Sequence, residues 1–243
     1  MKIRINPIAV SSILVLMSCN SSTTRNEKTD ASKGDGWEYL FDGVSLKGWH
    51  TYGQDTIGKA WKMEHSILHL DASAKDGWQT KNGGDIITDK EYENFDLQLE
   101  WKISEGGNSG IIFYAHEDTS KYKYAWESGP EMQICDNAKN EDGKVYKSRA
   151  GELYELMPIS KDVVKPAGEW NKVEIIASKG KLDFTINGEH VLSTTLWDDN
   201  WRKLMAGTKF EKMRGFGTYK KGKISLQDHA ADVWFRNLKI KKL

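Results

Sequence analysis

The sequence predicts an all-β protein, a sandwich of two antiparallel sheets with one short helix. The run Phe95–Ile103 alternates apolar and polar residues without a break, which is the period of a half-buried strand. Asn187 and Gly188 stand between two apolar runs and predict a tight hairpin, because both residue types tolerate positive φ. Other short apolar runs are separated by turn residues, a pattern typical of a two-sheet sandwich.

Each further element follows from the same two signals, an apolar run and the turn residues that bound it. In Phe95–Ile103 the side chains of Leu97, Leu99 and Trp101 are expected to face the core, with Glu100 facing the other way. The glycine-rich run Gly106–Gly110 is predicted to turn the chain into a strand. The predicted strands after it are Ile111–Tyr114, Glu131–Cys135, Asn171–Ala177, Lys181–Ile186, Lys223–Gln227 and Val233–Ile240. A helical pattern occurs only in Asp198–Met205, where Asp198 or Asp199 would cap a short helix.

Residues 1–18 have the pattern of a lipoprotein signal peptide. Lys2 and Arg4 precede an apolar run that is too short for a membrane-spanning helix, which needs about 20 residues. The run ends in Leu16-Met17-Ser18-Cys19, the pattern that a lipoprotein signal peptidase reads. Cys19 is therefore the predicted lipidation site, and several acyl chains would anchor the protein stably to a membrane. The alternative is an ordinary secretory signal in which Cys19 is incidental.

Residues 19–36 are predicted to be a disordered tether. They include no large apolar side chain, so they cannot bury enough surface to offset the entropy lost on ordering. Asn20 stands where an aspartate would signal inner-membrane retention in many Gram-negative bacteria. We therefore expect a cell-envelope lipoprotein in the outer membrane, with the leaflet left open. Residues 37–243 contain no linker or repeat and are expected to form one domain.

The composition narrows the classes of partner. The 35 basic side chains are balanced by 35 acidic ones, so no nucleic-acid partner is expected. With Cys19 lipidated, Cys135 has no partner for an intramolecular disulfide and is expected to be a buried small residue; zinc-type cysteine spacing is absent. The 10 tryptophans fit either of two roles, stacking on the apolar faces of sugar rings or filling a sandwich core. The oligomeric state is left open.

Short motifs follow one another in a fixed order through residues 37–243. They are Leu40-Phe41-Asp42-Gly43, Leu46-Lys47-Gly48-Trp49, Gly107-Asn108-Ser109-Gly110-Ile111, Gly129-Pro130-Glu131-Met132-Gln133-Ile134 with Asp136-Asn137, Arg149-Ala150-Gly151 with Leu153-Tyr154, Gly168-Glu169-Trp170-Asn171, Asn187-Gly188, Lys209-Phe210, Ile224-Ser225-Leu226-Gln227-Asp228-His229 and Val233-Trp234-Phe235-Arg236-Asn237-Leu238-Lys239-Ile240. This ordered set resembles the 3-keto-disaccharide hydrolase family over essentially the whole domain. The resemblance implies a concanavalin-like jelly roll that acts on glycosides oxidised to a ketone at C3 of the sugar.

The chemistry implied by this resemblance is an elimination followed by a hydration. A carbonyl at C3 acidifies the proton on C2, so a base can remove that proton and form an enolate. The enolate expels the substituent at C1, and addition of water completes a net hydrolysis. The route needs a base, a group that holds the oxyanion and an acid for the departing oxygen. An ordinary glycosidase would need two facing carboxylates, and no adjacent Glu/Asp motif of the glucanase jelly-roll type is present.

Glu131 and His229 are the predicted catalytic residues, for proton transfer or oxyanion support, with the division of roles left open. Glu131 and Gln133 are two residues apart on one strand, so both project from the face opposite to Met132 and Ile134. Gln227 and His229 repeat this spacing. The predicted substrate-binding residues are Glu100, Asn108, Ser109, Gln133, Tyr154, Lys209, Gln227 and Arg236. We expect Glu100, Glu131 and His229 to share one concave sheet.

A divalent metal is a candidate cofactor, and the sequence makes no cofactor certain. Glu131, Asp136 and His229 are competent ligands for an ion that would stabilise the enolate as a Lewis acid, although their spacing is not diagnostic. Glu131 and Asp136 differ in parity along a strand, so their convergence would require a bulge or turn at Cys135.

The predicted partner is a glycoside or oligosaccharide, and two functions remain open. The first is an enzyme that hydrolyses 3-keto-glycosides or 3-keto-disaccharides in the cell envelope. The second is a non-catalytic carbohydrate-binding lipoprotein that uses the same sheet and its tryptophans. A lectin needs amides and aromatic rings but has little use for Glu131 with His229, so the ionisable pair favours the enzyme.

Overall fold

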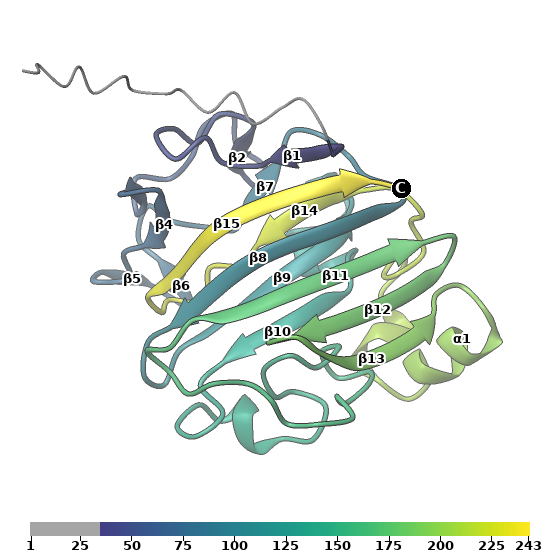
Figure 1. Ribbon diagram of the computed structural model, residues 1–243. Helices are drawn as coiled ribbons and strands as arrows, with labels where there is room; N and C mark the ends of the chain where they lie inside the picture. Colours follow the sequence, from purple (N-terminus) through teal and green to yellow (C-terminus); the bar gives the residue numbers. More distant parts are fainter. Residues whose placement is uncertain (1–34) are drawn as a thin grey trace, which may run out of the picture. The chain divides into compact units, whose positions relative to one another are not determined.

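Two antiparallel β-sheets pack against each other in the computed structural model, which describes residues 35–243 (Figure 1). The larger sheet has eight strands, β13 (Glu189–Thr195), β12 (Lys181–Ile186), β11 (Asn171–Ser178), β8 (Phe95–Ile103), β15 (Val233–Lys242), β4 (Ile67–Leu70) and β3 (Trp61–Glu64) in spatial order, with β1 (Trp37–Tyr39) also paired to β15. The smaller sheet has five, in the order β10 (Glu131–Cys135), β9 (Asn108–Ala115), β14 (Lys223–Leu226), β7 (Ile86–Thr88) and β2 (Trp49–Thr51). The predicted two-sheet jelly-roll sandwich is confirmed.

Short elements complete the described part of the chain. They are the two-stranded ribbon of β5 (Lys75–Asp76) and β6 (Gln79–Thr80), the helix α1 (Asp199–Met205), and the 3-10 turns η1 (Ala125–Glu127), η2 (Asp142–Lys144) and η3 (Lys209–Lys212). Asp198 caps α1, since its Oδ1 accepts the N–H of Trp201 at 2.8 Å. The predicted short helix is therefore confirmed, with Asp198 rather than Asp199 as its cap.

The core lies between the two sheets and takes alternate side chains from each. Along β8 buried and half-buried positions alternate without exception, and Leu97, Leu99 and Trp101 are buried as predicted. From β10, Met132 and Ile134 enter the same core. Burying each such side chain is worth about 1.5–3 kcal/mol, so the alternation determines which face of each strand turns inward.

The strand bounds agree with the sequence pattern at β8, β10 and β12, differ by one or two residues at the ends of β11, β14 and β15, and differ most at β9. The predicted glycine-rich turn Gly106–Gly110 is too long, because Asn108, Ser109 and Gly110 pair with Cys135, Ile134 and Gln133 of β10. The predicted hairpin is confirmed: Asn187 and Gly188 join β12 to β13 with φ of 52° and 87°. Cys135 is a buried free thiol, also as predicted.

One row of side chains crosses the outer face of the five-stranded sheet. His50, Ile87, Ser225, Ile112 and Glu131 are successive register partners on β2, β7, β14, β9 and β10. Ala125 of η1 packs on Ile87 and Ile112 and covers the middle of this row. The outer face is thereby divided, with Glu131 on one side of the η1 segment and His50 on the other.

The predictions for residues 1–18, for Cys19 and for most of the 19–36 tether lie outside the described residues. Within residues 35–243, none of the helices has the length and apolar character needed to cross a bilayer.

Candidate active site

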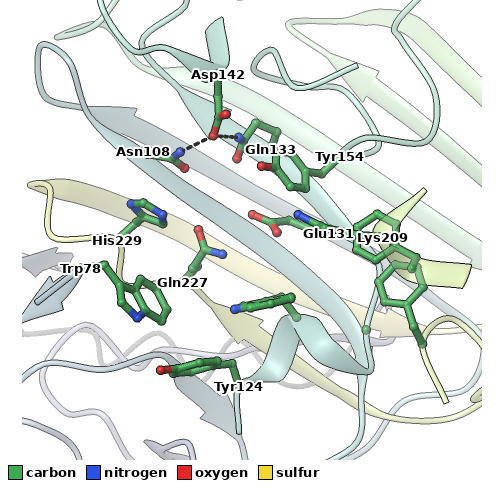
Figure 2. A pocket seen from close by; sticks show the side chains of 14 residues that line it. Trp78, Asn108, Tyr124, Glu131, Gln133, Asp142, Tyr154, Lys209, Gln227 and His229 are labelled. Atoms are coloured by element: carbon green, nitrogen blue, oxygen red, sulfur yellow. Dashed lines mark hydrogen bonds between the residues drawn. The ribbon is translucent and has the colours of Figure 1, made fainter. Parts of the chain in front are cut away.

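A cavity of about 200 Å³ opens on the Glu131 side of this outer face. Figure 2 shows polar side chains on its floor and aromatic rings around them. The lining residues are Trp78, Asn108, Tyr124, Trp126, Gly129, Glu131, Gln133, Asp142, Tyr154, Lys209, Phe210, Phe216, Gln227 and His229. They come from β9, β10, the 3-10 turns η1, η2 and η3 and connecting segments, so the site is assembled from distant parts of the chain.

Glu131 is the most deeply placed acid of the cavity, with 7% of its surface exposed. Burial raises the pKa of its carboxyl well above the usual value of 4.5, and the negative charges of Asp85, Asp142 and Glu155 raise it further. Lys209 acts in the opposite direction. A carboxylate whose pKa is raised by a cavity is suited to act as a base near neutral pH, removing a proton from a C–H or O–H bond of a bound molecule.

Two amides beside Glu131 are held by one carboxylate. The Nδ2 of Asn108 donates to Oδ2 of Asp142 at 2.8 Å, and the Nε2 of Gln133 donates to the same oxygen at 3.4 Å (Figure 2). Asp142 therefore fixes which way both amides point. Gln227, the first residue after β14, adds a third amide to the cavity.

Lys209 and Tyr154 form one end of the cavity. The backbone N–H of Tyr154 donates to the carbonyl of Glu131 at 3.0 Å, which places its ring beside that residue. The Nζ of Lys209 lies 4.6 Å from the centre of this ring and pairs with Oε1 of Glu155 at 2.8 Å. An ammonium group held here is available to stabilise negative charge that develops on a bound carbonyl oxygen.

His229, Trp78 and Tyr124 form the other end, and Trp126 lies between the two ends, with the centre of its ring 5.6 Å from Nζ of Lys209. The rings of Trp78 and His229 are 5.3 Å apart, and Trp78 meets Tyr124 edge to face at 4.8 Å. Tyr124 in turn stacks with Trp126 at 5.9 Å. A sugar ring has apolar faces and hydroxyl groups around its edge. It can therefore stack on aromatic rings while its hydroxyl groups bond to the polar side chains beside them.

The structure gathers most of the predicted site residues around this cavity. Glu131, His229, Asn108, Gln133, Tyr154, Lys209 and Gln227 all line it. Ser109 does not: it is fully buried, and its Oγ donates to the carbonyl of Gln227 at 2.8 Å. Ser109 therefore holds the backbone of Gln227 in place and does not reach a molecule bound in the cavity.

The expectation that Glu100 shares a face with Glu131 is wrong. Glu100 lies on β8 of the larger sheet, and its carboxylate binds Nε and Nη2 of Arg236 at 2.9 and 2.6 Å. The guanidinium of Arg236 also stacks on Trp170 at 4.1 Å. Both residues point outward from the sheet opposite to the cavity, so Glu100 and Arg236 form a structural ion pair there.

The candidate metal ligands Glu131, Asp136 and His229 do not come together. The carboxylate of Asp136 accepts the backbone N–H groups of Gly106 at 2.8 Å and Ala138 at 3.0 Å, and Asp136 does not line the cavity. Among residues 35–243, no three His, Cys, Asp or Glu side chains lie close enough together to share an ion. These three residues therefore do not fit a common metal.

The sequence did not predict that three aromatic residues and two acidic residues belong to this site. Trp78, Tyr124 and Trp126 reach the cavity from connecting segments, and the high tryptophan content was their only signal. Asp142, which orients the amides, and Asp85, which lies beneath the site with 2% exposure, had no signal of their own. Burial raises the pKa of Asp85 to about 7, and the charge of Asp228 adds to this effect.

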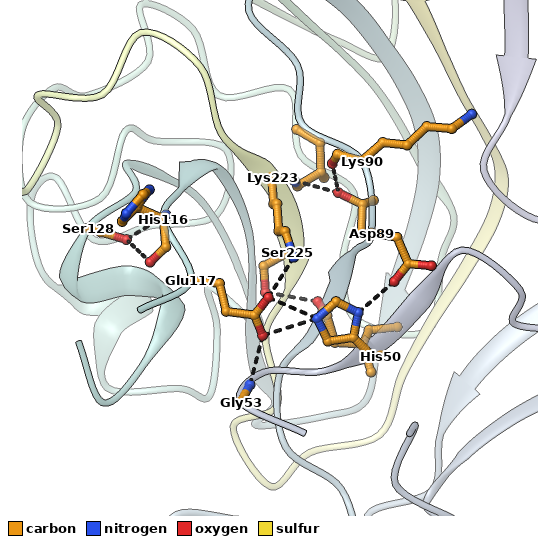
Figure 3. Close-up of polar contacts among 12 residues, drawn as sticks. His50, Gly53, Asp89, Lys90, His116, Glu117, Ser128, Lys223 and Ser225 are labelled. Carbon is orange, nitrogen blue, oxygen red and sulfur yellow. Dashed lines mark hydrogen bonds and ion pairs between the residues drawn. The ribbon is translucent and has the colours of Figure 1, made fainter. Parts of the chain in front are cut away.

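A separate polar network lies beyond η1 on the same face (Figure 3). His50 contacts Asp89 through Nδ1 at 2.6 Å and Glu117 through Nε2 at 2.9 Å. Glu117 also pairs with Lys223 at 2.5 Å and accepts the N–H of Gly53 at 2.9 Å. Because these contacts join β2, β14 and the segment that follows β9, the network anchors the start of the segment that carries Tyr124 and Trp126.

Fold and cavity together define a two-sheet jelly-roll protein whose aromatic cavity holds a buried carboxyl group and an imidazole. The chain belongs to the 3-keto-alpha-glucoside-1,2-lyase-like domain family, whose pattern matches residues 36–241. It is 37% identical to a 3-keto-disaccharide hydrolase of Bacteroides thetaiotaomicron over 86% of this chain and 79% of that protein.

Two solved structures from Parabacteroides distasonis, both provisionally described as glycosyl hydrolases, share the fold. One has a TM-score of 0.77 at 31% identity and covers 88% of this chain and 97% of its own. The other has a TM-score of 0.65 at 26% identity and covers 86% of this chain and all of its own. The predicted family is therefore confirmed.

Proposed function

We propose that this protein cleaves 3-keto-glycosides, including 3-keto-disaccharides, by elimination and hydration. The observation that carries the proposal is Glu131, a buried carboxylate of raised pKa, between an ammonium group and an imidazole in an aromatic cavity. The name of the Bacteroides relative, a 3-keto-disaccharide hydrolase, supports the same substrate class.

Glu131 is assigned as the base. It takes the proton from C2, and the electron pair of that C–H bond passes into the enolate formed with the C3 carbonyl. Lys209, at the Tyr154 end of the cavity, faces the enolate oxygen and stabilises its charge.

His229 is assigned as the acid at the opposite end. Collapse of the enolate breaks the bond from C1 to the leaving oxygen, and His229 gives that oxygen a proton. The product is an enone with a double bond between C1 and C2. Water then adds its hydroxyl to C1 and a proton to C2, which gives the free 3-keto sugar.

The test compares oxidised and unoxidised substrates with matched variants. The purified protein is expected to release the leaving group from 3-keto-glucosides and 3-keto-trehalose and to leave the parent glycosides intact. Glu131→Gln and His229→Asn should each lower turnover by roughly two to four decades. Glu100→Gln is the control, since it makes the same change in a strand carboxylate that pairs with Arg236 on the other sheet.

Three outcomes would contradict the proposal. Equal rates on oxidised and unoxidised glycosides would indicate a conventional glycosidase. Binding of both without turnover would indicate a sugar-binding module. Near-parental turnover in both Glu131→Gln and His229→Asn would show that the reaction takes place elsewhere.

We also propose that the protein acts in the cell envelope, anchored by lipid on Cys19 to the outer membrane. The support is the sequence Leu16-Met17-Ser18-Cys19 followed by a polar tether. A tether between lipid and domain would leave the cavity open to glycosides that enter the envelope.

A further inference from the structure

The proposed proton transfers do not require the two aromatic rings, Trp78 and Tyr124, at one end of the cavity. In Figure 2, Trp78, Tyr124 and His229 lie at one end, Lys209 and Tyr154 at the other, and Glu131 and Gln227 between them. If the C3 carbonyl of the substrate faces Lys209, the C1 substituent points towards Trp78 and Tyr124. These two rings do not touch the reacting atoms in that arrangement, so their role lies with the leaving group.

The polar groups at this end match a sugar better than an aryl group. Asn108, Gln227 and His229 line the cavity near the rings, and each carries hydrogen-bonding atoms. An aryl leaving group could not hydrogen-bond to these side chains, and each buried polar atom left without a partner costs about 1–3 kcal/mol. A pyranose offers an apolar face to Trp78 and hydroxyl groups to the amides.

Asp228 connects the two segments that carry this end. Its carboxylate is fully buried. It accepts the backbone N–H and the Oγ1 hydroxyl of Thr80 at 2.9 and 2.8 Å. It also accepts the N–H of Gly84 at 2.7 Å and that of Ala230 at 2.9 Å. Thr80 is two residues from Trp78 in the β5–β6 ribbon, and Ala230 follows His229 directly.

The backbone packs closely around the carboxylate of Asp228. A Cβ atom at Gly83 would lie 2.4 Å from Oδ2 of Asp228, so the loop after β6 wraps closely around the carboxylate. The backbone N–H of Asp228 itself donates to Oδ1 of Asp85 at 3.0 Å. One side chain thus ties the segment of Trp78 to the segment of His229 through four donors.

We propose that Trp78 and Tyr124 form a subsite for a pyranose leaving group, and that Asp228 is the positioning residue that holds Trp78 beside His229. The subsite rests on the proposed function, since it assigns the leaving-group side of the same cavity. It makes a 3-keto-disaccharide a better substrate than a 3-keto-glycoside with a small leaving group.

The test measures two substrates that differ only in the leaving group, 3-keto-trehalose and methyl 3-keto-glucoside. Trp78→Ala should lower kcat/KM for the disaccharide about tenfold through KM, as expected for loss of one aromatic contact. The methyl glycoside should change less than threefold. Asp228→Asn should raise KM for the disaccharide more than KM for the methyl glycoside, while kcat falls for both because Asp228 also fixes the segment of His229. A general loss of fold would lower the yield of active protein without changing the ratio of the two KM values.

Thr80→Val is the second variant, should Asp228→Asn fail to fold. It removes only the Oγ1 donor to Asp228 and should shift KM for the disaccharide in the same direction by a smaller factor. Asp183→Asn is the matched control, because Asp183 pairs with His190 on the larger sheet. The subsite is refuted if Trp78→Ala and Asp228→Asn change KM for both substrates equally or change neither KM.

Binding to the Glu131→Gln variant separates this inference from the proposed function. By titration calorimetry, 3-keto-trehalose should bind about tenfold more weakly when Trp78→Ala is added, with methyl 3-keto-glucoside unaffected. A parent protein without turnover would overturn the proposed function while this difference still supported the subsite. Equal weakening of both ligands would overturn the subsite whatever the activity.

Discussion

The side chain of Glu131 lies over the backbone of Gly110 on the neighbouring strand. A Cβ atom at residue 110 would be 1.8 Å from Oε1 of Glu131 and 2.5 Å from its carboxyl carbon. β9 can therefore carry no side chain at this point without moving the acid. The glycine of the Gly107–Ile111 motif is explained by the site and not by a turn, since Gly110 is paired within a strand.

Gly110→Ala should displace the Glu131 carboxylate and leave the fold intact, because the side chain of Glu131 can move away while the strands stay paired. We expect turnover of a 3-keto-glucoside to fall by about 10²-fold, the order of loss seen for a misplacement of about 1 Å. Gly188→Ala is the control: it strains a hairpin with φ of 87° but meets no atom within 4 Å. It should lower the melting temperature without reducing turnover of folded protein. Parental turnover in Gly110→Ala would contradict this account of the glycine.

The pH dependence of turnover should report the raised pKa of Glu131. A base must be ionised, so kcat/KM should rise with pH along an acidic limb whose midpoint lies well above 4.5. Asp85→Asn removes a negative charge that raises this pKa, so its limb should move to lower pH. Rate measurements from pH 4 to 9 check both statements. A limb at the ordinary glutamate value would show that Glu131 is not the base.

Asp85 should make stability depend on pH in the opposite sense to an ordinary carboxylate. Its pKa is raised from 3.8 to about 7 by burial, so between these values the folded state binds more protons than the unfolded one. Stability contributed by this group is therefore lost as pH rises from about 4 to about 7. The free energy of unfolding of Asp85→Asn, relative to that of the parent, should therefore increase by up to about 4 kcal/mol as pH rises over this range. Denaturant titrations that show a constant difference would contradict the prediction.

Glu117 should show the reverse sign. Burial alone would raise its pKa, but hydrogen bonds from Lys223, Gly53 and His50 outweigh burial and hold the pKa below its ordinary value. Its contribution to stability is present above the unfolded pKa and is lost as pH falls through the folded pKa. Glu117→Gln should therefore cost about 2 kcal/mol at pH 7, with the difference from the parent vanishing in acid. A cost that is independent of pH would show that the charge of Glu117 does not matter.

Cys19→Ser should release the protein from membranes. Without a thiol at residue 19 no diacyl group can be attached, and the segment before it is too short to span a bilayer. Cell fractionation followed by immunodetection checks the outcome, with Cys135→Ser as the control for loss of a cysteine. If Cys19→Ser fractionates with membranes as the parent does, the lipid anchor is wrong.

The sequence by itself determined the local features of the fold and the chemical types in the site. Alternation along Phe95–Ile103 depends only on neighbouring residues, so it located β8 and its buried face correctly. The two-residue spacing of Glu131 and Gln133 likewise placed both side chains on the outer face of β10, where they line one cavity. These inferences need only the period of a strand. Gln227 and His229 also line the cavity, but they follow the end of β14, so the strand period does not account for them.

The tertiary structure alone decided which outer face each polar residue joined. A period of two separates inward from outward, but a sandwich has two outward faces, and strand pairing between distant segments chooses between them. For that reason Glu100 binds Arg236 on one sheet while Glu131 lines a cavity on the other. Trp78, Tyr124 and Asp142 reach that cavity from segments outside the two sheets. Buried contacts such as those of Asp228 with Thr80, far apart in the chain, set the position of such segments, and no local pattern encodes them.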